Sequence, residues 1–374
     1  MRSPDRLPVG SLLLAAASTL LALAALEASF RAVAFLEGRH SFEAALTRGA
    51  RLAPGASASL GDLIRPSRDP DIVYELAPDL HVSFLGAPLS TSHAGFRDRE
   101  YSPEKPAGTF RVLGLGDSIM FGWGVGDEED YLSLLEARLE ATPVGRPVEV
   151  LNLAVPGYNS VMEVATLREK GIAYAPDLVI VGLCGNDASL PYFLQAPPEV
   201  LAFDRSFLAD FVRSRFDGGD EDGETPFLVN RPVKAGWRHT RDEDAALVPP
   251  RYAHMVGLPA FRGAMQELKR QGEAHGFGVL LLYYPGAPRE MREIISAVGL
   301  ASLSTAPAVR RFLIEHGGGE APLSLLRRTA RDPHPSQAGH QLIADALFEH
   351  LGGGTRPGTP ARAKHSPPRP SAPE

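Results

Sequence analysis

The stretch GLGDSIMFGWGV, residues 114–125, decides the fold, because an apolar run ends in it and a glycine-rich turn follows. The residues FRVL stand directly before it, and a short apolar run that ends in glycine is typical of a buried strand. Ser118 follows that strand, between Asp117 and Ile119. A serine here is a turn residue, part of a phosphate-binding loop or a nucleophile, and the rest of the sequence has to decide between these.

Strand and helix patterns alternate after this stretch. Further apolar runs suit strands at 148–155, 177–187 and 277–285. Helical spacing of apolar residues covers 128–141, 160–174 and about 259–275, with Ser160 as a candidate N-cap, and a last helix is expected from Pro335. This alternation predicts an α/β fold with a parallel central sheet that is covered on both faces.

Composition narrows the class of protein. The 374 residues are 44% hydrophobic and 22% charged, which predicts a globular protein with a sizeable core. The net charge is −7 and there is no basic stripe, so nucleic acid is not an expected partner. Cys184 is the single cysteine, which rules out an internal disulfide and a disulfide scaffold. The sequence has no cluster of metal ligands, and we expect no metal and no cofactor.

The N-terminus carries an uncharged stretch from Leu7 to Leu26, long enough to match a bilayer core of about 30 Å. Arg2 and Arg6 precede it, which favours a cytoplasmic N-terminus and an extracytoplasmic main domain. Residues 1–27 are therefore a signal anchor or a signal peptide that is cut after Ala22–Ala24. The first alternative gives a membrane-anchored periplasmic or cell-surface domain and the second a secreted one. A buried helix of a soluble protein is the third interpretation.

The remaining chain divides into a leader, a main domain and a tail. Residues 28–107 are rich in turn residues, with short candidate strands around 72–76 and 81–84, and we expect them to pack on the main domain. The main domain covers 108–352 and contains a long insertion at about 189–258. Residues 353–374 are rich in Gly, Pro and Arg and are expected to be disordered.

The phosphate-loop interpretations of Ser118 fail on spacing. A Walker loop needs a lysine that is missing here, and a dinucleotide-binding fingerprint that starts at Gly114 meets Ile119 where its third glycine belongs. One that starts at Gly122 meets Asp127. The nucleophile elbow G-x-S-x-G is absent too, because Met120 stands in place of its last glycine, which disfavours an α/β-hydrolase.

The motif GDSIMFGWG resembles the first block of the SGNH, or GDSL, hydrolases, and the other blocks of that family follow in order. Gly157 lies in NLAVPGYNS, Asn186 in CGND, and Asp332 and His334 in RDPHPSQAGH. The resemblance spans about residues 111–351. It implies a three-layer α/β/α flavodoxin-like fold and a serine esterase in which Ser118 is the nucleophile. His334 would be the base, Asp332 its orienting acid, and Ser118, Gly157 and Asn186 the oxyanion hole.

The sequence departs from the family in two places. Only Pro333 separates Asp332 from His334, where the family usually has two residues, so the carboxylate could point away from the ring. A Ser–His dyad or a carboxylate from elsewhere remains an alternative. The third block also lacks a residue between Gly185 and Asn186.

Three functions are compatible with these residues. The first is an extracytoplasmic esterase for an ester of a lipid, a small molecule or an O-acylated glycan. The second is an O-acyltransferase that acts on a cell-surface polysaccharide, and the third is a non-catalytic envelope scaffold. Several side chains have a purely structural alternative: Gly157 in a Pro-Gly turn, Phe121 and Trp123 in the core rather than an acyl pocket, His340 as an ordinary helix residue, and Cys184 as a small apolar core residue.

Overall fold

A parallel sheet of five strands forms the centre of the protein. The computed structural model describes residues 9–45, 52–142, 146–191, 194, 206–209, 212, 248–284, 286–329 and 332–352. In chain order the strands of this sheet are β6 (Phe110–Leu115), β7 (Val148–Asn152), β8 (Leu178–Leu183), β9 (Gly278–Tyr283) and β10 (Ala301–Ser304). Their spatial order, β7-β6-β8-β9-β10, is that of flavodoxin-like folds, which confirms the predicted α/β class.

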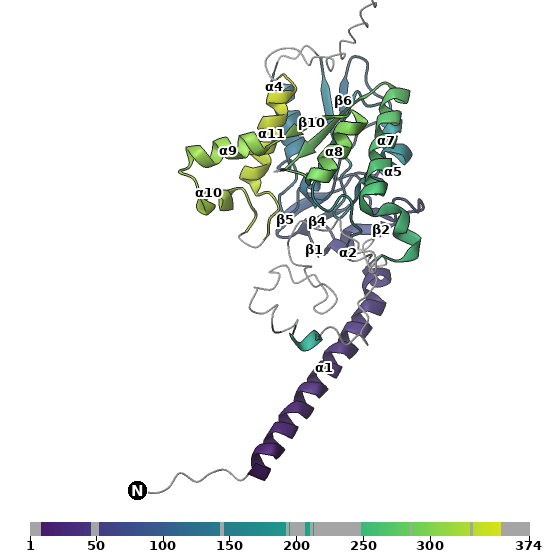
Figure 1. Cartoon of the computed structure of the whole chain (residues 1–374). Helices are drawn as coiled ribbons and strands as arrows, with labels where there is room; N and C mark the ends of the chain where they lie inside the picture. Colours follow the sequence, from purple (N-terminus) through teal and green to yellow (C-terminus); the bar gives the residue numbers. More distant parts are fainter. Residues whose placement is uncertain are drawn as a thin grey trace, which may run out of the picture.

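Helices cover both faces of this sheet (Figure 1). One face carries α5 (Ser160–Glu169), α7 (Gly257–His275) and α8 (Arg289–Val298), and the other α4 (Tyr131–Ala141) and α11 (Gln337–His350). Alternate strand residues serve the two layers: Val112 and Ile180 face α4 and α11, while Leu113 and Val179 face α5 and α7. Of two further helices, α9 (Ala306–Glu315) packs beside α11, and α10 (Glu320–Leu325) packs beside α9. The sheet is therefore the middle of three layers.

Two predicted helix starts and one strand differ from the sequence analysis. Asn159, not Ser160, caps α5, because its side chain accepts hydrogen bonds from the first free N–H groups of the helix. Ser336 caps α11, which begins at Gln337 rather than at Pro335. The strand β10 was not predicted, since it is a short edge strand whose side chains are mostly exposed and whose sequence, ASLS, has no apolar run.

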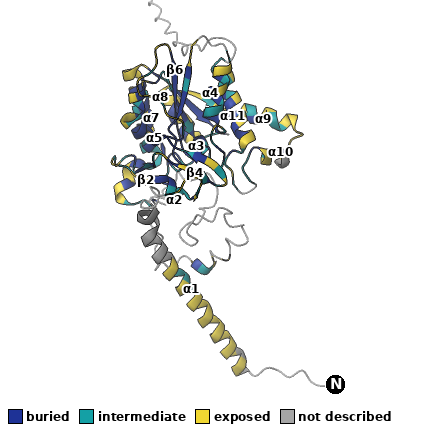
Figure 2. Cartoon of the chain, turned by 180° about the vertical axis from the view of Figure 1, so that it is seen from behind, coloured by how far each residue is buried: buried dark blue, intermediate teal, exposed yellow. Residues whose placement is uncertain are grey.

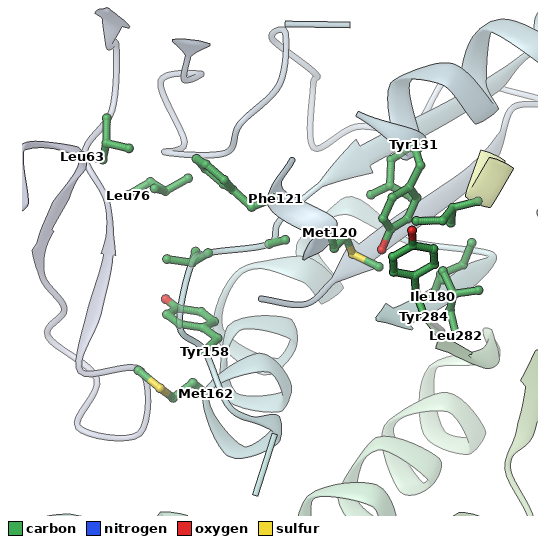
Figure 3. Packing of buried hydrophobic residues seen from close by; sticks show 14 of the residues in the cluster. Leu63, Leu76, Met120, Phe121, Tyr131, Tyr158, Met162, Ile180, Leu282 and Tyr284 are labelled. Atoms are coloured by element: carbon green, nitrogen blue, oxygen red, sulfur yellow. The ribbon is translucent and has the colours of Figure 1, made fainter. Parts of the chain in front are cut away.

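Residues 52–108, which we call the N-terminal segment, form small sheets at one end of the domain (Figure 1). Their elements are β1 (Ser57–Ala58), α2 (Leu60–Leu63), β2 (Ile64–Pro66), β3 (Tyr74–Leu76), β4 (His81–Phe84) and β5 (Ala87–Ser90). Apolar side chains of this segment belong to the same buried cluster as the core, and Figure 3 shows Leu63 and Leu76 with Phe121 and Tyr158. The segment thus covers the edge of the sheet where the strands end.

The N-terminal helix α1 (Val9–Ala45) is long and apolar enough to cross a membrane over Leu13–Val33. Its described side chains in that span are largely exposed, as Figure 2 shows, which argues against a buried helix of a soluble core. The carboxylate of Glu27 accepts hydrogen bonds from the backbone N–H groups of Phe207 and Leu208 in the insertion. Most of the insertion and the tail 353–374 lie outside the described residues.

Candidate active site

Ser118 is the first residue of the short helix α3 (Ser118–Phe121), which directly follows β6. The Asp117 side chain caps this helix and accepts a hydrogen bond from Ile119 N at 3.0 Å. Gly122 ends it in the left-handed conformation, with φ of 88°. The sharp turn places the half-buried Ser118 at the carboxyl edge of the parallel sheet, where open α/β folds bind ligands.

His334 and Asp332 meet Ser118 from the other end of the chain. His334 Nε2 lies 2.8 Å from Ser118 Oγ, and His334 Nδ1 lies 2.6 Å from Asp332 Oδ1. The same Asp332 oxygen accepts the backbone N–H of His334 at 3.0 Å, so the short Asp-Pro-His spacing folds the carboxylate back onto its own histidine. The structure therefore joins the three side chains in one hydrogen-bonded chain.

Arg328 holds the other oxygen of this carboxylate. Its Nη1 lies 2.8 Å from Asp332 Oδ2, and its backbone N–H donates to His334 O at 2.8 Å. Burial raises the pKa of Asp332, but the hydrogen bonds and charge of His334 and the hydrogen bond from Arg328 outweigh burial and hold this pKa below its ordinary value. Asp332 is therefore ionised at neutral pH. The sequence analysis missed Arg328, although a cation four residues before the acid was a visible signal.

The indole ring of Trp123 stacks on the His334 ring, with centroids 5.1 Å apart and planes at 21°. Phe84 of β4 also contacts Trp123, in an edge-to-face arrangement with centroids 4.9 Å apart. Phe121 is fully buried and belongs to the core, so of the two aromatics only Trp123 borders the site. Its contact with His334 could not be inferred from the sequence, because the two residues are joined only by the fold.

The oxyanion candidates follow the two strands beside β6. Gly157 comes after β7, at the third position of a turn in which Tyr158 N donates to Val155 O, with φ of 80°. It is thus in the Pro-Gly turn that was its structural alternative. Asn186 follows β8, and its Nδ2 donates to Asp117 Oδ2 at 3.2 Å. That oxygen also lies 3.4 Å from Ser118 Oγ, so Asp117 links Asn186 to the serine.

Buried acidic groups lie behind these loops. Cys184 is buried as expected, but its Sγ lies 3.0 Å from Asp117 Oδ2, so it is not a purely apolar core residue. Asp187 accepts a hydrogen bond from Cys184 N. Glu163 of α5 is fully buried, and its carboxylate oxygens have no hydrogen-bond partner within the described chain. Burial, together with the charges of Asp187 and Asp117, raises the pKa of Glu163 well above its ordinary value.

His340 has a structural place on α11. It is fully buried, its ring stacks on Tyr131, and its Nδ1 accepts the backbone N–H of Tyr131 at 3.2 Å. Burial lowers the pKa of His340 to about 3, aided by the positive charge of Arg97. The residue is therefore neutral and ties α11 to the start of α4. Across the described residues, no group of three His, Cys, Asp or Glu side chains is placed to hold a metal ion.

Comparison with known proteins gives one family match. The model of the GDSL-like lipase/acylhydrolase family matches residues 115–342. No curated protein matches the chain. Similar solved structures include an acetylxylan esterase from Geobacillus stearothermophilus, at 17% identity, a TM-score of 0.38, and coverage of 65% of this chain and 94% of that one. Another is LAE5, an alpha/beta hydrolase enzyme from the metagenome of Lake Arreo, Spain, at 18% identity, a TM-score of 0.39, and coverage of 65% and 95%.

Proposed function

The chain belongs to the GDSL-like lipase/acylhydrolase family and is a carboxylic-ester hydrolase, and from that premise we propose that it works through an acyl-enzyme on Ser118. The observation that carries the proposal is the contact of 2.8 Å between His334 Nε2 and Ser118 Oγ, with Asp332 at the far side of the ring. A hydroxyl is a poor nucleophile until a positioned base removes its proton, and this arrangement supplies one.

In the first half of the reaction, Ser118 Oγ attacks the ester carbon while His334 Nε2 takes its proton. Asp332 stays ionised and stabilises the imidazolium through its bond to Nδ1. The tetrahedral intermediate collapses, and His334 returns the proton to the departing alcohol. In the second half, His334 activates a water that attacks the acyl-serine, and the acid and free Ser118 are released.

The negative charge of the tetrahedral intermediate needs donors at the edge of the sheet. We assign the backbone N–H groups of Ser118 and Gly157 and the side-chain amide of Asn186 to this role. Ser118 N lies at the N-terminus of α3, and glycine at position 157 allows close approach of the backbone. An amide nitrogen carries two hydrogens, so Asn186 can contact Asp117 with one and a substrate oxygen with the other.

We place this site outside the cytoplasm. The uncharged stretch from Leu7 to Leu26, most of which lies in helix α1, and the basic residues before it support an anchor or signal at the N-terminus. The substrate we propose is an ester of a lipid, a small molecule or an O-acylated glycan that the active site meets in that compartment.

The activity is tested with the full chain in detergent and p-nitrophenyl esters of increasing acyl length. Ser118→Ala is the matched variant, because it removes one oxygen and leaves the fold unchanged. We expect wild-type turnover that falls to background in Ser118→Ala, and the preferred chain length measures the acyl site. Equal turnover in the two proteins would contradict the proposal.

The location is tested separately in a bacterial host. A reporter enzyme that is active only outside the cytoplasm is fused after residue 374. An active reporter is expected, together with recovery of the fusion in the membrane fraction if α1 is retained or in the soluble export fraction if it is cleaved. An inactive reporter on a stable fusion protein would contradict the extracytoplasmic placement.

A further inference from the structure

Arg97 of the N-terminal segment is inserted into the loop that follows the candidate nucleophile. Its side chain is 3% exposed, and it donates to backbone carbonyl oxygens on both sides of Trp123: those of Phe121, Gly122, Val125 and Gly126. A Cβ on Gly122 would lie 2.3 Å from Arg97 Nη1, so glycine allows the loop to close around the guanidinium. The loop after α3 is thus wrapped around a side chain from outside the parallel sheet.

This wrapping fixes Trp123. In the chain, Trp123 stands between the two pairs of residues whose carbonyl groups Arg97 holds, and its indole ring contacts Phe84 edge-to-face and stacks on His334. Phe84 also belongs to the N-terminal segment. Two residues of that segment therefore hold the ring on which the candidate catalytic base rests.

A third residue of the segment, Tyr74, reaches the loop that carries Gly157. The hydroxyl of Tyr74, a fully buried side chain, donates to the carbonyl oxygen of Pro156 at 2.8 Å, directly before Gly157. In return the hydroxyl of Tyr158 donates to Tyr74 O, and the two rings meet edge-on at 5.3 Å. Val73, just before Tyr74, has φ of 64°, a conformation that a β-branched residue rarely adopts and that only its surroundings can maintain.

We infer that the N-terminal segment is a working part of the active site, in which Arg97 and Tyr74 are positioning residues for His334 and for the oxyanion loop at Gly157. The inference rests on the proposed function, since it needs those groups to be catalytic. Its physical basis is the steep dependence of rate on geometry: a misplacement of about 1 Å at reacting groups can cost about 100-fold in rate. Four carbonyl contacts by one buried guanidinium restrict the loop in a way that an ammonium, with three donors, cannot reproduce.

The structure provides a matched control for Arg97. Arg111 is also a fully buried arginine, and it also touches the N-terminal segment, through a 3.1 Å hydrogen bond from its Nη1 to Pro103 O. It lies at the start of β6, next to Glu149 of β7, whereas Ser118 follows the end of β6. A lysine at 111 removes the same guanidinium from the same kind of buried site without touching the catalytic edge.

The experiment measures kcat, KM and thermal stability of the full-length wild type, Arg97→Lys, Tyr74→Phe and Arg111→Lys with one p-nitrophenyl ester. We expect kcat to fall about 10- to 100-fold in Arg97→Lys and about 3- to 10-fold in Tyr74→Phe, with KM changed less than about threefold. Arg111→Lys should lose stability but keep its kcat within about threefold of the wild type. Tyr74→Phe removes only a hydroxyl, so it remains informative if Arg97→Lys does not fold.

The inference is overturned if the folded variants at 97 and 74 keep kcat within about threefold of the wild type, or if Arg111→Lys loses as much kcat as they do. These outcomes are separate from failure of the proposed function. That failure shows in the wild type itself, as absence of turnover or as turnover that survives Ser118→Ala. If turnover is lost in Ser118→Ala but unchanged in Arg97→Lys and Tyr74→Phe, the proposed esterase function stands and the N-terminal segment has no positioning role.

Discussion

Trp123 lies flat against His334, with ring centroids 5.1 Å apart and planes at 21°, so the candidate base is held between an indole face and a carboxylate. Stacking limits rotation of the imidazole about its side-chain bonds, while Asp332 fixes which nitrogen faces Ser118. Two kinds of restraint therefore act on one ring, and they can be removed one at a time.

Removal of the indole tests the first restraint. We expect Trp123→Leu to lower kcat about tenfold, because the imidazole gains freedom and spends less time in contact with Ser118. Trp123→Phe keeps an aromatic face and should stay within about threefold of the wild type. Steady-state kinetics with a short-chain ester measures both. Equal losses of kcat in the two variants would show that stacking of an aromatic ring on His334 does not account for the effect.

Removal of Arg328 tests how the carboxylate is held. Loss of this cation raises the pKa of Asp332 toward its ordinary value. A carboxyl group whose pKa is lowered by folding stabilises the native state at pH values above its ordinary pKa, and this stabilisation is lost as the pH falls through the folded pKa. Arg328→Met should therefore be less stable than the wild type at neutral pH, and this difference should shrink as the pH falls below the ordinary carboxyl pKa.

The measurement is the free energy of unfolding as a function of pH, from urea denaturation, with Arg327→Met as the control for loss of a neighbouring positive charge. The contact of 2.8 Å with Asp332 Oδ2 belongs to Arg328. Losses of stability that are equal in both variants would indicate a general charge effect and not this contact.

The amide of Asn186 is tested by deletion. Loss of one oxyanion donor typically costs about 10²- to 10³-fold in kcat, and we expect Asn186→Ala to fall in this range with little change in KM. Cys184→Ala removes the thiol that contacts both Asp117 Oδ2 and Asn186 Oδ1 but keeps the amide donor, so it serves as the control, with kcat kept within about threefold. Comparable losses in the two variants would assign the effect to Asp117 and its surroundings instead of to the oxyanion.

Glu163 affects the pH dependence of stability. The pKa of Glu163 is raised in the folded protein. When the pH rises above the ordinary pKa of a glutamate, the unfolded chain therefore releases a proton that the native state keeps. Stability then falls with increasing pH, by up to about 1.4 kcal/mol per pH unit for one proton. Glu163→Gln removes this loss and should gain stability relative to the wild type between about pH 5 and pH 8.

Urea denaturation at these two pH values measures the gain. Glu169→Gln, at the exposed end of the same helix, is the matched control. In this variant the free energy of unfolding should differ between the two pH values by as much as it does in the wild type. If the free energy of unfolding differs between the two pH values as much in Glu163→Gln as in the wild type, the responsible group is another member of the buried acidic cluster.

Much of the fold could be predicted from the sequence because buried parallel strands are continuous apolar runs. The runs that gave β6, β7, β8 and β9 are of this kind. Edge strand β10 has no such run, since its side chains need no apolar pattern. Helix caps were misplaced by one or two residues because Asn159 and Ser160 are both good caps, and only the fold decides which one acts.

The sequence also predicted some features of the candidate site and left others open. Ser118, Gly157 and Asn186 lie within five residues of the ends of β6, β7 and β8, so the order of the predicted strands brings them to one edge of the sheet. The sequence left open whether Asp332 turns back onto His334 across a single proline. Local hydrogen bonds between the two residues decide that it does. The contacts of Trp123 with His334 and of Arg97 with the loop after α3 depend on packing between distant segments, which no local pattern encodes. Arg328, in contrast, lies only four residues before Asp332.

The central claim is that Ser118 is the nucleophile activated by His334, and covalent labelling tests it most directly. The full-length protein is treated with a fluorophosphonate, digested, and the modified residue identified by mass spectrometry. We predict a single adduct on Ser118, absent in Ser118→Ala and formed at least about 100-fold more slowly in His334→Ala. A folded wild type that forms no adduct, or an adduct on another residue that persists in Ser118→Ala, would contradict the claim.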